Sequence, residues 1–259
     1  MVRLLSGLVL AAGAVAAILW LPALPLRLLV CAVACLGARE YAAVAGLTKA
    51  RGLMMVCVVS LCWLISGDAL PRSEWLLSAA LAWVGIEVLF LDRGIQQAGA
   101  AVVAPFYVGA PLGMLVVIRE HGGWQAAMLV MAAVVVSDSA QYYTGRTLGR
   151  HPLAPSISPK KTVEGAAGGF VAGTLLMATL GRYVFPSTGP LVLAGLGATM
   201  VGLGICGDLF ESRLKRTAGV KDSAALIPGH GGVLDRLDAL LFVVPAFYLF
   251  LRLAAGTAP

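Results

Sequence analysis

Residues 191–210 read LVLAGLGATMVGLGICGDLF, an apolar run whose one charged residue is Asp208. Runs of about 17–25 apolar residues are typical of helices that cross a bilayer. Similar runs recur from one end of the 259-residue chain to the other. Only 12% of the residues are charged, whereas soluble globular proteins contain about 25%. The sequence therefore predicts an all-α polytopic membrane protein.

Hydropathy, with proline, glycine and charged residues taken as boundaries between apolar runs, predicts nine membrane-spanning helices. Their expected bounds are Leu4–Leu21, Leu26–Gly46, Gly52–Ser66, Trp75–Leu91, Ala101–Ile118, Trp124–Tyr143, Val163–Leu180, Leu191–Phe210 and Val233–Leu253. The first span resembles a signal peptide but is interpreted as an uncleaved helix. Inside the second span, Arg39 and Glu40 are interpreted as a neutralising pair. Nothing marks a second domain, so residues 1–259 are expected to form one transmembrane domain.

Basic residues are distributed unevenly between the two sets of loops. Loops on the N-terminal side carry most of the 19 Lys and Arg residues. Because cytoplasmic loops carry an excess of Lys and Arg, the N-terminus is expected in the cytoplasm. The two longest polar loops, about Thr144–Thr162 and Glu211–Gly232, then face the cytoplasm from the inner membrane. A soluble nucleotide can reach them there.

Polar residues gather in two clusters, of which the first covers residues 207–238. Asp208, Ser212 and Lys215 are spaced i, i+4 and i+7, so a continuing helix places them on one face. A carboxylate, a hydroxyl and an ammonium group on one face can hold a cation and a phosphate together. A charged helix end that reaches into the membrane interface is the structural alternative.

Residues 221–238, which read KDSAALIPGHGGVLDRLD, weaken that alternative. Gly231 and Gly232 allow backbone N–H groups to turn toward an anion. Asp235 and Asp238 follow them, and carboxylates at the edge of an apolar helix are costly and usually functional. An N-capping role for Asp235 stays open, because the helix dipole favours a carboxylate there.

A metal ion is expected in this first cluster. If the last two spans pack together, Asp208 and Asp235 can converge on one cation. Mg²⁺ typically binds one or two carboxylates, with water and substrate phosphates as further ligands. The basic residues close by in the sequence are Lys215, Arg216, Lys221 and His230. The residues therefore predict a triphosphate bound with Mg²⁺, and a second cation is left as an alternative.

The second cluster covers residues 138–165. Asp138 lies in an apolar span and is a functional candidate, or it pairs with Arg146 for structure. Ser158-Pro159 is typical of a turn and a helix start. The lysines that follow, Lys160 and Lys161, bind either a substrate or anionic headgroups. A substrate-binding role is favoured because both clusters share one face of the membrane.

Residues 212–238 resemble the signature of the phosphatidate cytidylyltransferases, also called CDP-diacylglycerol synthases. They read SRLKRTAGVKDSAALIPGHGGVLDRLD and agree with the signature in residue type and spacing. Residues 138–165 are similar to the upstream pattern of the family, and the hydropathy of the chain is similar too. The chain departs from the family at Gln141, Val163, Ala224 and Ala225. These departures spare the charged positions, so they leave the lipid preference more open than the activity.

The resemblance implies an enzyme that transfers the cytidylyl group of CTP to phosphatidic acid and releases pyrophosphate. It implies Asp208 and Asp235 as ligands of the divalent metal. The expected catalytic residues are Ser212, Lys215, Asp222, His230 and Asp238. The expected substrate contacts are Asp138, Arg146, Lys160, Lys161, Thr162, Glu164, Arg216, Lys221, Gly231, Gly232 and Arg236. No Cys or Ser–His pair suggests a covalent intermediate, so direct displacement is expected.

Other functions stay open at this point. One is a CTP-dependent kinase, or a cytidylyltransferase that acts on another lipid phosphate or a prenol. A transporter is disfavoured because the polar residues lie in loops and at span ends rather than near the midplane. A non-catalytic scaffold leaves the clustered residues unexplained. The expected partners are CTP, phosphatidic acid and membrane lipids, without nucleic acid, and a homodimer is kept as an alternative to a monomer.

Overall fold

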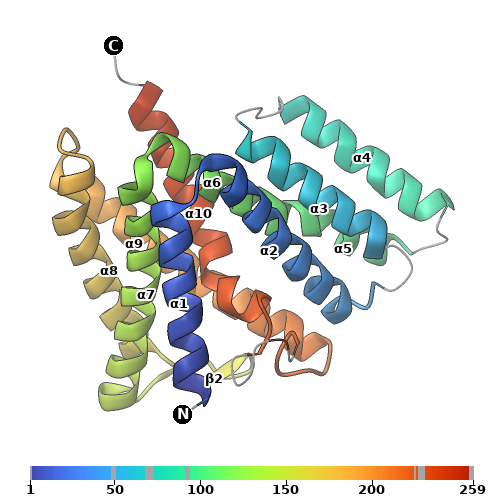
Figure 1. Ribbon diagram of the computed structural model, residues 1–259. Coiled ribbons are helices and arrows are strands. Elements are labelled where there is room, and N and C mark those ends of the chain that lie inside the picture. The colour runs from blue at the N-terminus through green and yellow to red at the C-terminus, as the bar shows by residue number, and fades with distance from the viewer. Residues whose placement is uncertain are drawn as a thin grey trace. The chain divides into compact units, whose positions relative to one another are not determined.

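The protein is built almost entirely of helices, as expected for an all-α fold (Figure 1). The computed structural model describes residues 2–47, 51–67, 73–90, 94–224, 226 and 231–256. In chain order the elements are α1 (Val2–Trp20), α2 (Ala23–Val44), α3 (Arg51–Ser66), α4 (Ser73–Phe90), α5 (Ile95–Ala104), the π-helical η1 (Pro105–Gly109), α6 (Ala110–His121), α7 (Gly123–Leu148), β1 (Pro152–Ala154), β2 (Ser158–Thr162), α8 (Val163–Val184), α9 (Pro190–Thr217) and α10 (Leu234–Gly256).

Five helical stretches within the described residues are long and apolar enough to cross a membrane. They are Ile95–His121, Gly123–Leu148, Val163–Val184, Pro190–Thr217 and Leu234–Ala254. Each of the expected spans overlaps a helix of the structure. The protein is therefore a polytopic membrane protein, whereas the count of nine spans and the cytoplasmic N-terminus stay predictions.

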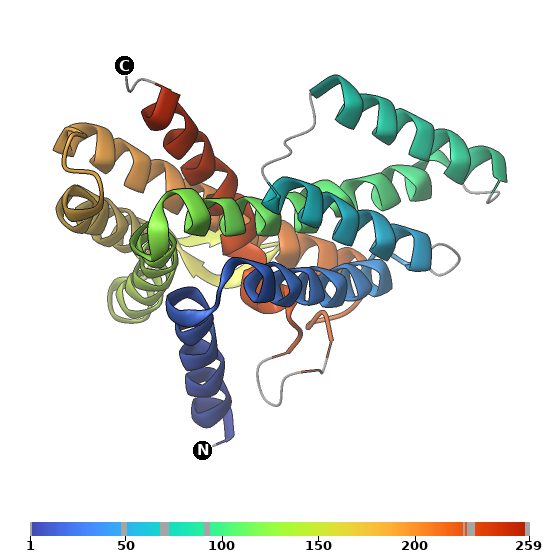
Figure 2. The same cartoon turned by 45° about the horizontal axis from the view of Figure 1, so that its top comes forward.

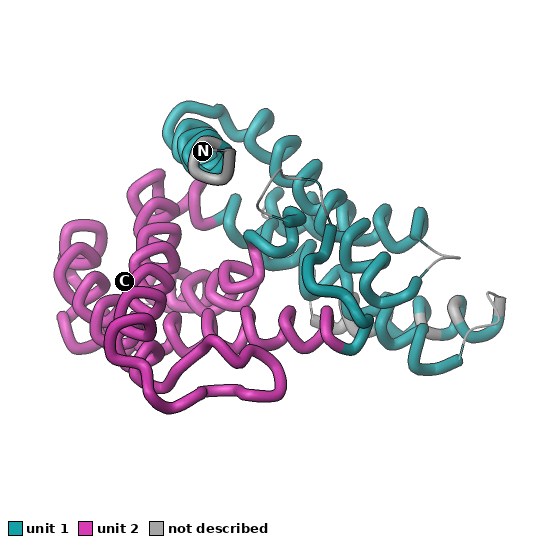
Figure 3. The backbone as a smooth tube through the Cα atoms, turned by 90° about the horizontal axis from the view of Figure 1, so that it is seen from below, with its two compact units in different colours: residues 1–117, 217–236 teal, residues 118–216, 237–259 magenta. Residues whose placement is uncertain are grey.

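The chain divides into two compact units, which Figure 3 shows in different colours. Unit 1 comprises Met1–Val117 and Thr217–Arg236, so it holds α1 to η1, most of α6 and the segment that precedes and opens α10. Unit 2 comprises Ile118–Arg216 and Leu237–Pro259, with α7, the two strands, α8 and most of α9 and α10. The expected single transmembrane domain stays a prediction.

In unit 1, α2 and α3 pack against each other and against η1. The hydroxyl of Tyr41 on α2 donates a hydrogen bond to the carbonyl of Ala100, at 2.9 Å. Pro105 would normally end a helix, because its ring has no N–H and clashes with the carbonyl four residues before it. Here one π turn accommodates it. The helical stretch Ile95–His121 therefore continues through Pro105, and it begins before the expected start at Ala101.

In unit 2, α7 and α8 lie side by side (Figure 1, Figure 2). Buried glycines recur at every fourth position of α8, at Gly165, Gly169 and Gly173. A Cβ atom at Gly169 would meet the side chain of Gln141 on α7. Lipid tails are as apolar as leucine, so membrane helices associate through close packing at small residues rather than through the hydrophobic effect. The glycines of α8 provide this close packing.

A β-hairpin joins α7 to α8, and the sequence interpretation missed it. The strands β1 and β2 pair antiparallel, with Ala154 opposite Ser158. The prediction that Ser158 and Pro159 form a turn and a helix start is therefore wrong, because both residues open β2. The helix begins only after Thr162, whose hydroxyl accepts a hydrogen bond from the N–H of Gly165 at 3.1 Å. Thr162 is the N-cap of α8.

The contact between α8 and α9 predicts what a larger side chain would do there. Gly197 on α9 is buried, and a Cβ atom on it would meet the side chain of Met177 and the carbonyl of Gly173. We expect Gly197→Leu to lower the free energy of unfolding by about 1–3 kcal/mol, the usual cost of overpacking. Denaturant titration in detergent micelles measures this change.

Gly195 provides the matched control for this variant. It lies two residues earlier on α9, is exposed, and has open space where a Cβ atom would stand. Gly195→Leu is expected to leave the free energy of unfolding nearly unchanged. Equal losses in the two variants would contradict the proposed packing of α8 on α9.

Candidate functional site

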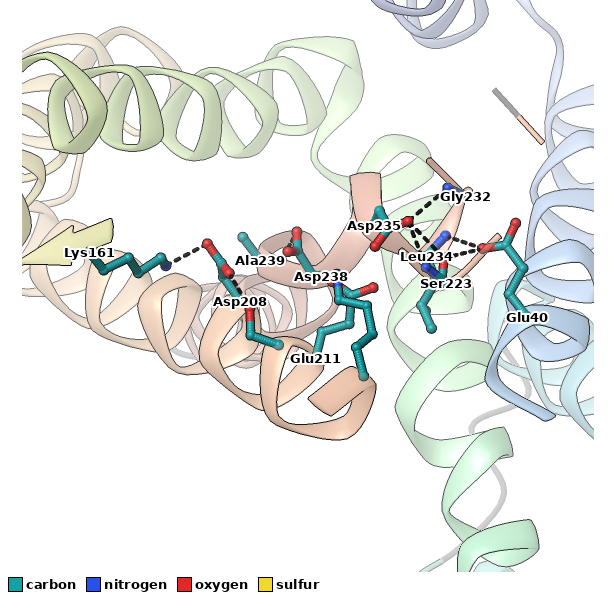
Figure 4. A network of polar contacts seen from close by, with 12 residues as sticks. Glu40, Lys161, Asp208, Glu211, Ser223, Gly232, Leu234, Asp235, Asp238 and Ala239 are labelled. Carbon is teal, nitrogen blue, oxygen red and sulfur yellow. Dashed lines mark hydrogen bonds and ion pairs between the residues drawn. The ribbon is translucent and has the colours of Figure 1, made fainter. Parts of the chain in front are cut away.

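Several of the predicted site residues take part in two networks of polar contacts, one within each unit (Figure 4). The unit 2 network comprises Asp138, Lys161, Asp208, Glu211, Ser212, Lys215 and Asp238. The unit 1 network comprises Glu40, Ser223, Gly232, Val233, Leu234 and Asp235.

Asp208 is the centre of the unit 2 network. Because α9 continues to Thr217, Asp208 and Ser212 lie one helical turn apart, and the Ser212 hydroxyl donates to Asp208 Oδ1 at 3.3 Å. This confirms the helix continuation expected from their spacing. The hairpin brings Lys161 to the same carboxylate, and its ammonium group forms an ion pair with Asp208 Oδ2. Sequence spacing did not reveal this pair, because it joins two elements.

Two further carboxylates surround Asp208. Asp138 on α7 and Asp238 on α10 lie close enough for their charges to interact with that of Asp208. Lys161 offsets part of the repulsion on Asp138, and Lys215 offsets part of that on Asp238. A Cβ atom at Gly207 would meet the backbone carbonyl of Asp238, so α9 and α10 approach closely beside Asp208. The charges of three carboxylates from three helices therefore interact with one another in this network.

The oxygen donors of this network fit a hard divalent cation, since Mg²⁺ prefers carboxylate oxygens. Within the described residues, however, no three His, Cys, Asp or Glu side chains stand close enough together to hold a metal ion. Asp208 lies in unit 2 and Asp235 in unit 1. Their predicted convergence on one cation therefore stays a prediction.

Lys215 forms an ion pair with Glu211, at 3.1 Å between Nζ and Oε2. Glu211 is a buried carboxylate, with only 1% of its side chain exposed. The sequence interpretation placed Lys215 on the face of Asp208 but did not single out Glu211. Lys215 thus lies on α9 with a carboxylate partner one turn before it.

Two of the predicted substrate contacts hold the hairpin and the start of α8. Glu164 accepts hydrogen bonds from the backbone N–H groups of Arg150 and His151, at 3.0 and 3.2 Å. It also contacts Nδ1 of His151. Thr162 caps α8, as described above. These contacts give both residues a structural role, and their substrate-binding role stays a prediction.

The sequence left open whether Asp138 pairs with Arg146, and in the structure each of them has another hydrogen-bond partner. Asp138 accepts a hydrogen bond from Gln141 at 3.0 Å, and Arg146 donates to the hydroxyl of Tyr142 at 3.1 Å. Both contacts run along α7 itself. This leaves the charge of Asp138 to interact with Asp208 and Asp238 instead.

Asp235 organises the unit 1 network. Its Oδ2 accepts hydrogen bonds from the N–H of Gly232 at 2.7 Å and from both the N–H and the hydroxyl of Ser223, at 3.0 and 2.9 Å. These donors lie before α10, in which Asp235 is the second residue. An N-cap precedes its helix, so the N-capping role left open by the sequence is not adopted, and the metal-binding role of Asp235 stays a prediction.

Glu40 is the residue that the sequence interpretation misjudged. It is 5% exposed and accepts hydrogen bonds from the Ser223 hydroxyl and from the N–H groups of Val233 and Leu234. Arg39, its expected partner in a neutralising pair, is exposed. That interpretation is wrong, because Glu40 accepts hydrogen bonds from Ser223 and from the start of α10. A glutamate within an apolar span was the available signal, but its partners lie far away in the sequence.

The remaining predicted residues are exposed, lie beside Asp235 or fall outside the described residues. Those that are exposed are Arg146, Lys160, Arg216, Lys221, Asp222 and Arg236. Gly231 has a φ of 78°, which favours glycine, and a Cβ atom there would meet Asp235 Oδ2. His230 and Ala225 lie outside the described residues.

Comparison with known proteins places the chain in a family. It matches the cytidylyltransferase family over residues 1–254. It is 34% identical to a phosphatidate cytidylyltransferase of Pseudomonas aeruginosa, over 99% of this chain and 98% of the relative. It is 37% identical to the Bacillus subtilis phosphatidate cytidylyltransferase over 72% of this chain and 70% of that one. A phosphatidate cytidylyltransferase of Thermotoga maritima is 38% identical over 60% and 59%. The chain therefore belongs to the cytidylyltransferase family, a family of nucleotidyltransferase enzymes.

Proposed function

We propose that the protein transfers the cytidylyl group of CTP to phosphatidic acid, which gives CDP-diacylglycerol and pyrophosphate. The observation that carries this proposal is the similarity along the whole chain to a relative named phosphatidate cytidylyltransferase. The unit 2 network supports it, because the charges of three carboxylates on α7, α9 and α10 interact there and Lys161 pairs with one of them. In the proposed orientation this network faces the cytoplasm from the inner membrane, where CTP is available.

The proposed reaction is a direct displacement. A phosphate oxygen of phosphatidic acid attacks the α-phosphorus of CTP and forms a new P–O bond. The bond between the α-phosphorus and the oxygen that bridges to the β-phosphate breaks, and its electron pair leaves with pyrophosphate. Transfers of this kind depend on orientation and on neutralisation of charge more than on a covalent nucleophile.

The side chains of the unit 2 network supply both requirements. Asp208 would hold Mg²⁺, and family resemblance implies Asp235 as a second ligand. Bound Mg²⁺ would neutralise negative charge on the triphosphate. Lys161 contacts Asp208 in the structure, and in the proposal its ammonium group exchanges this partner for a phosphate oxygen. The exposed Arg216 and Lys221 would attract the nucleotide.

Labelled CTP tests the reaction itself. In purified protein with phosphatidic acid, label at the α-phosphate of CTP is expected to move into the lipid, because the bond that breaks lies beyond that phosphorus. Label at the γ-phosphate is expected in pyrophosphate. Thin-layer chromatography of the lipid fraction measures the product. Transfer of the γ label to the lipid would identify a kinase instead, and faster turnover of a prenyl phosphate would identify another lipid substrate.

Removal of the Asp208 charge tests the metal proposal. Asp208→Asn keeps the shape of the side chain but loses the charge that pairs with Lys161. We expect kcat/KM to fall by at least about 100-fold, as for other removed electrostatic groups. Chelation of divalent cations is expected to abolish turnover in the unaltered protein, and added Mg²⁺ to restore it.

The control for this prediction is Glu120→Gln, which removes a carboxylate at the end of α6. It is expected to leave kcat/KM within about twofold, because Glu120 lies outside both polar clusters of the sequence. Turnover that persists without any divalent cation would contradict the metal proposal.

The two adjacent lysines of β2 are expected to differ. Lys161 is half-buried against Asp208, whereas Lys160 is exposed. We expect Lys161→Gln to lower kcat/KM for CTP by at least about tenfold, since a charge-assisted contact to phosphate is worth about 1.4 kcal/mol or more. Lys160→Gln is expected to cause a smaller loss. Steady-state kinetics measures both, and an equal or larger loss at Lys160 would contradict the placement of Lys161.

A further inference from the structure

Glu40 is a buried carboxylate that the proposed reaction does not use. Its oxygens accept hydrogen bonds from the Ser223 hydroxyl at 2.9 Å, from the N–H of Val233 at 2.9 Å and from the N–H of Leu234 at 2.8 Å (Figure 4). A buried carboxylate is strongly unfavourable unless such donors satisfy it. The position of Glu40 and that of its three donors therefore depend on each other.

Glu40 supplies acceptors to the start of α10. The first N–H groups of a helix have no partner within the helix, and the positive end of the helix dipole favours a negative charge beside them. Leu234 is the first residue of α10 and Val233 precedes it. A side chain of α2 thus caps α10 from a distant part of the sequence and fixes where this helix begins.

The hydroxyl of Ser223 links Glu40 to Asp235. Its Oγ atom lies 2.9 Å from Glu40 Oε2 and 2.9 Å from Asp235 Oδ2. A serine hydroxyl has a single proton to donate, so the two carboxylates share it. A shift of Glu40 would therefore change the hydrogen bonding of Asp235 directly.

Gly231 and Gly232 leave space for this arrangement. A Cβ atom at Gly232 would meet the Ser223 hydroxyl and the Glu40 carboxylate, and one at Gly231 would meet Asp235. The paired glycines therefore have a packing reason that is separate from their predicted substrate contacts. Each allows the backbone to approach one of the two carboxylates.

From these contacts we infer that Glu40 is a positioning residue, which holds the start of α10 and, through Ser223, orients the carboxylate of Asp235. The inference rests on the proposed function, in which Asp235 binds the metal ion of the nucleotide. Groups that orient a ligand carboxylate typically change metal affinity or activity by about 10–100-fold when they are replaced. Glu40 itself acts through Asp235 rather than on the substrate.

Hydrogen exchange without metal or nucleotide tests the positioning. Glu40→Gln keeps the side-chain size but replaces one acceptor oxygen with an amide that donates hydrogen bonds. Amide exchange in residues 231–235 is expected to accelerate by about 2–10-fold, the equivalent of one lost hydrogen bond. Exchange in α8 should stay unchanged. The control is Arg39→Gln, because Arg39 neighbours Glu40 but is exposed, and it is expected to behave as the unaltered protein.

The Mg²⁺ concentration that gives half-maximal turnover is the second readout. Glu40→Gln is expected to raise it by about tenfold, and Glu40→Asp, which keeps the carboxylate, is expected to raise it less. Arg39→Gln should leave it unchanged. A residue with a merely structural role would lower the amount of folded enzyme but would leave this Mg²⁺ concentration unaltered.

Unchanged exchange in residues 231–235, or an unchanged Mg²⁺ requirement, overturns the inference. If Glu40→Gln does not fold, Ser223→Ala replaces it, because this variant removes only the shared hydroxyl and is expected to shift both readouts in the same direction. Failure of the proposed function would look different. The unaltered protein would then form no CDP-diacylglycerol, and the exchange measurement alone would decide whether Glu40 positions the start of α10.

Discussion

The structure depends on one constraint of the bilayer, where no water is available to satisfy backbone N–H and C=O groups. Helices satisfy these groups internally, and the described chain is almost entirely helical. Even Pro105, which lacks a backbone N–H, is accommodated by a π turn and does not interrupt the stretch Ile95–His121. Since lipid provides no hydrophobic driving force between helices, close contact at glycines such as Gly169 and Gly197 takes its place.

The same constraint acts at the helix ends, where four N–H groups lack partners. Thr162 provides an acceptor at the start of α8, and Glu40 provides acceptors at the start of α10. Polar residues concentrate where helices end, so residues that cap a helix and residues that can bind a substrate occupy the same positions. For this reason Thr162, Glu164 and Asp235 each have a structural contact beside their predicted function.

The low polarity of the bilayer also favours pairing between charged side chains. In a medium of low polarity a charge must be paired, and Lys161 and Lys215 each contact a carboxylate of α9. Three carboxylates of the unit 2 network nevertheless lie near one another. Such a group of like charges favours a bound cation or a partner of opposite sign, which agrees with the chemistry proposed for this member of the cytidylyltransferase family.

The sequence alone determined the features that follow from local periodicity. Apolar runs located the helices, and the spacing of Asp208 and Ser212 placed both on one face of α9, because the helical repeat fixes neighbours four residues apart. The motif residues also identified the family. Only the tertiary structure decided which distant groups meet. Lys161 reaches Asp208 because two strands pair into a hairpin, and Glu40 meets Ser223 across 183 residues of sequence. Such partners are selected by packing between elements, for which no short-range pattern exists.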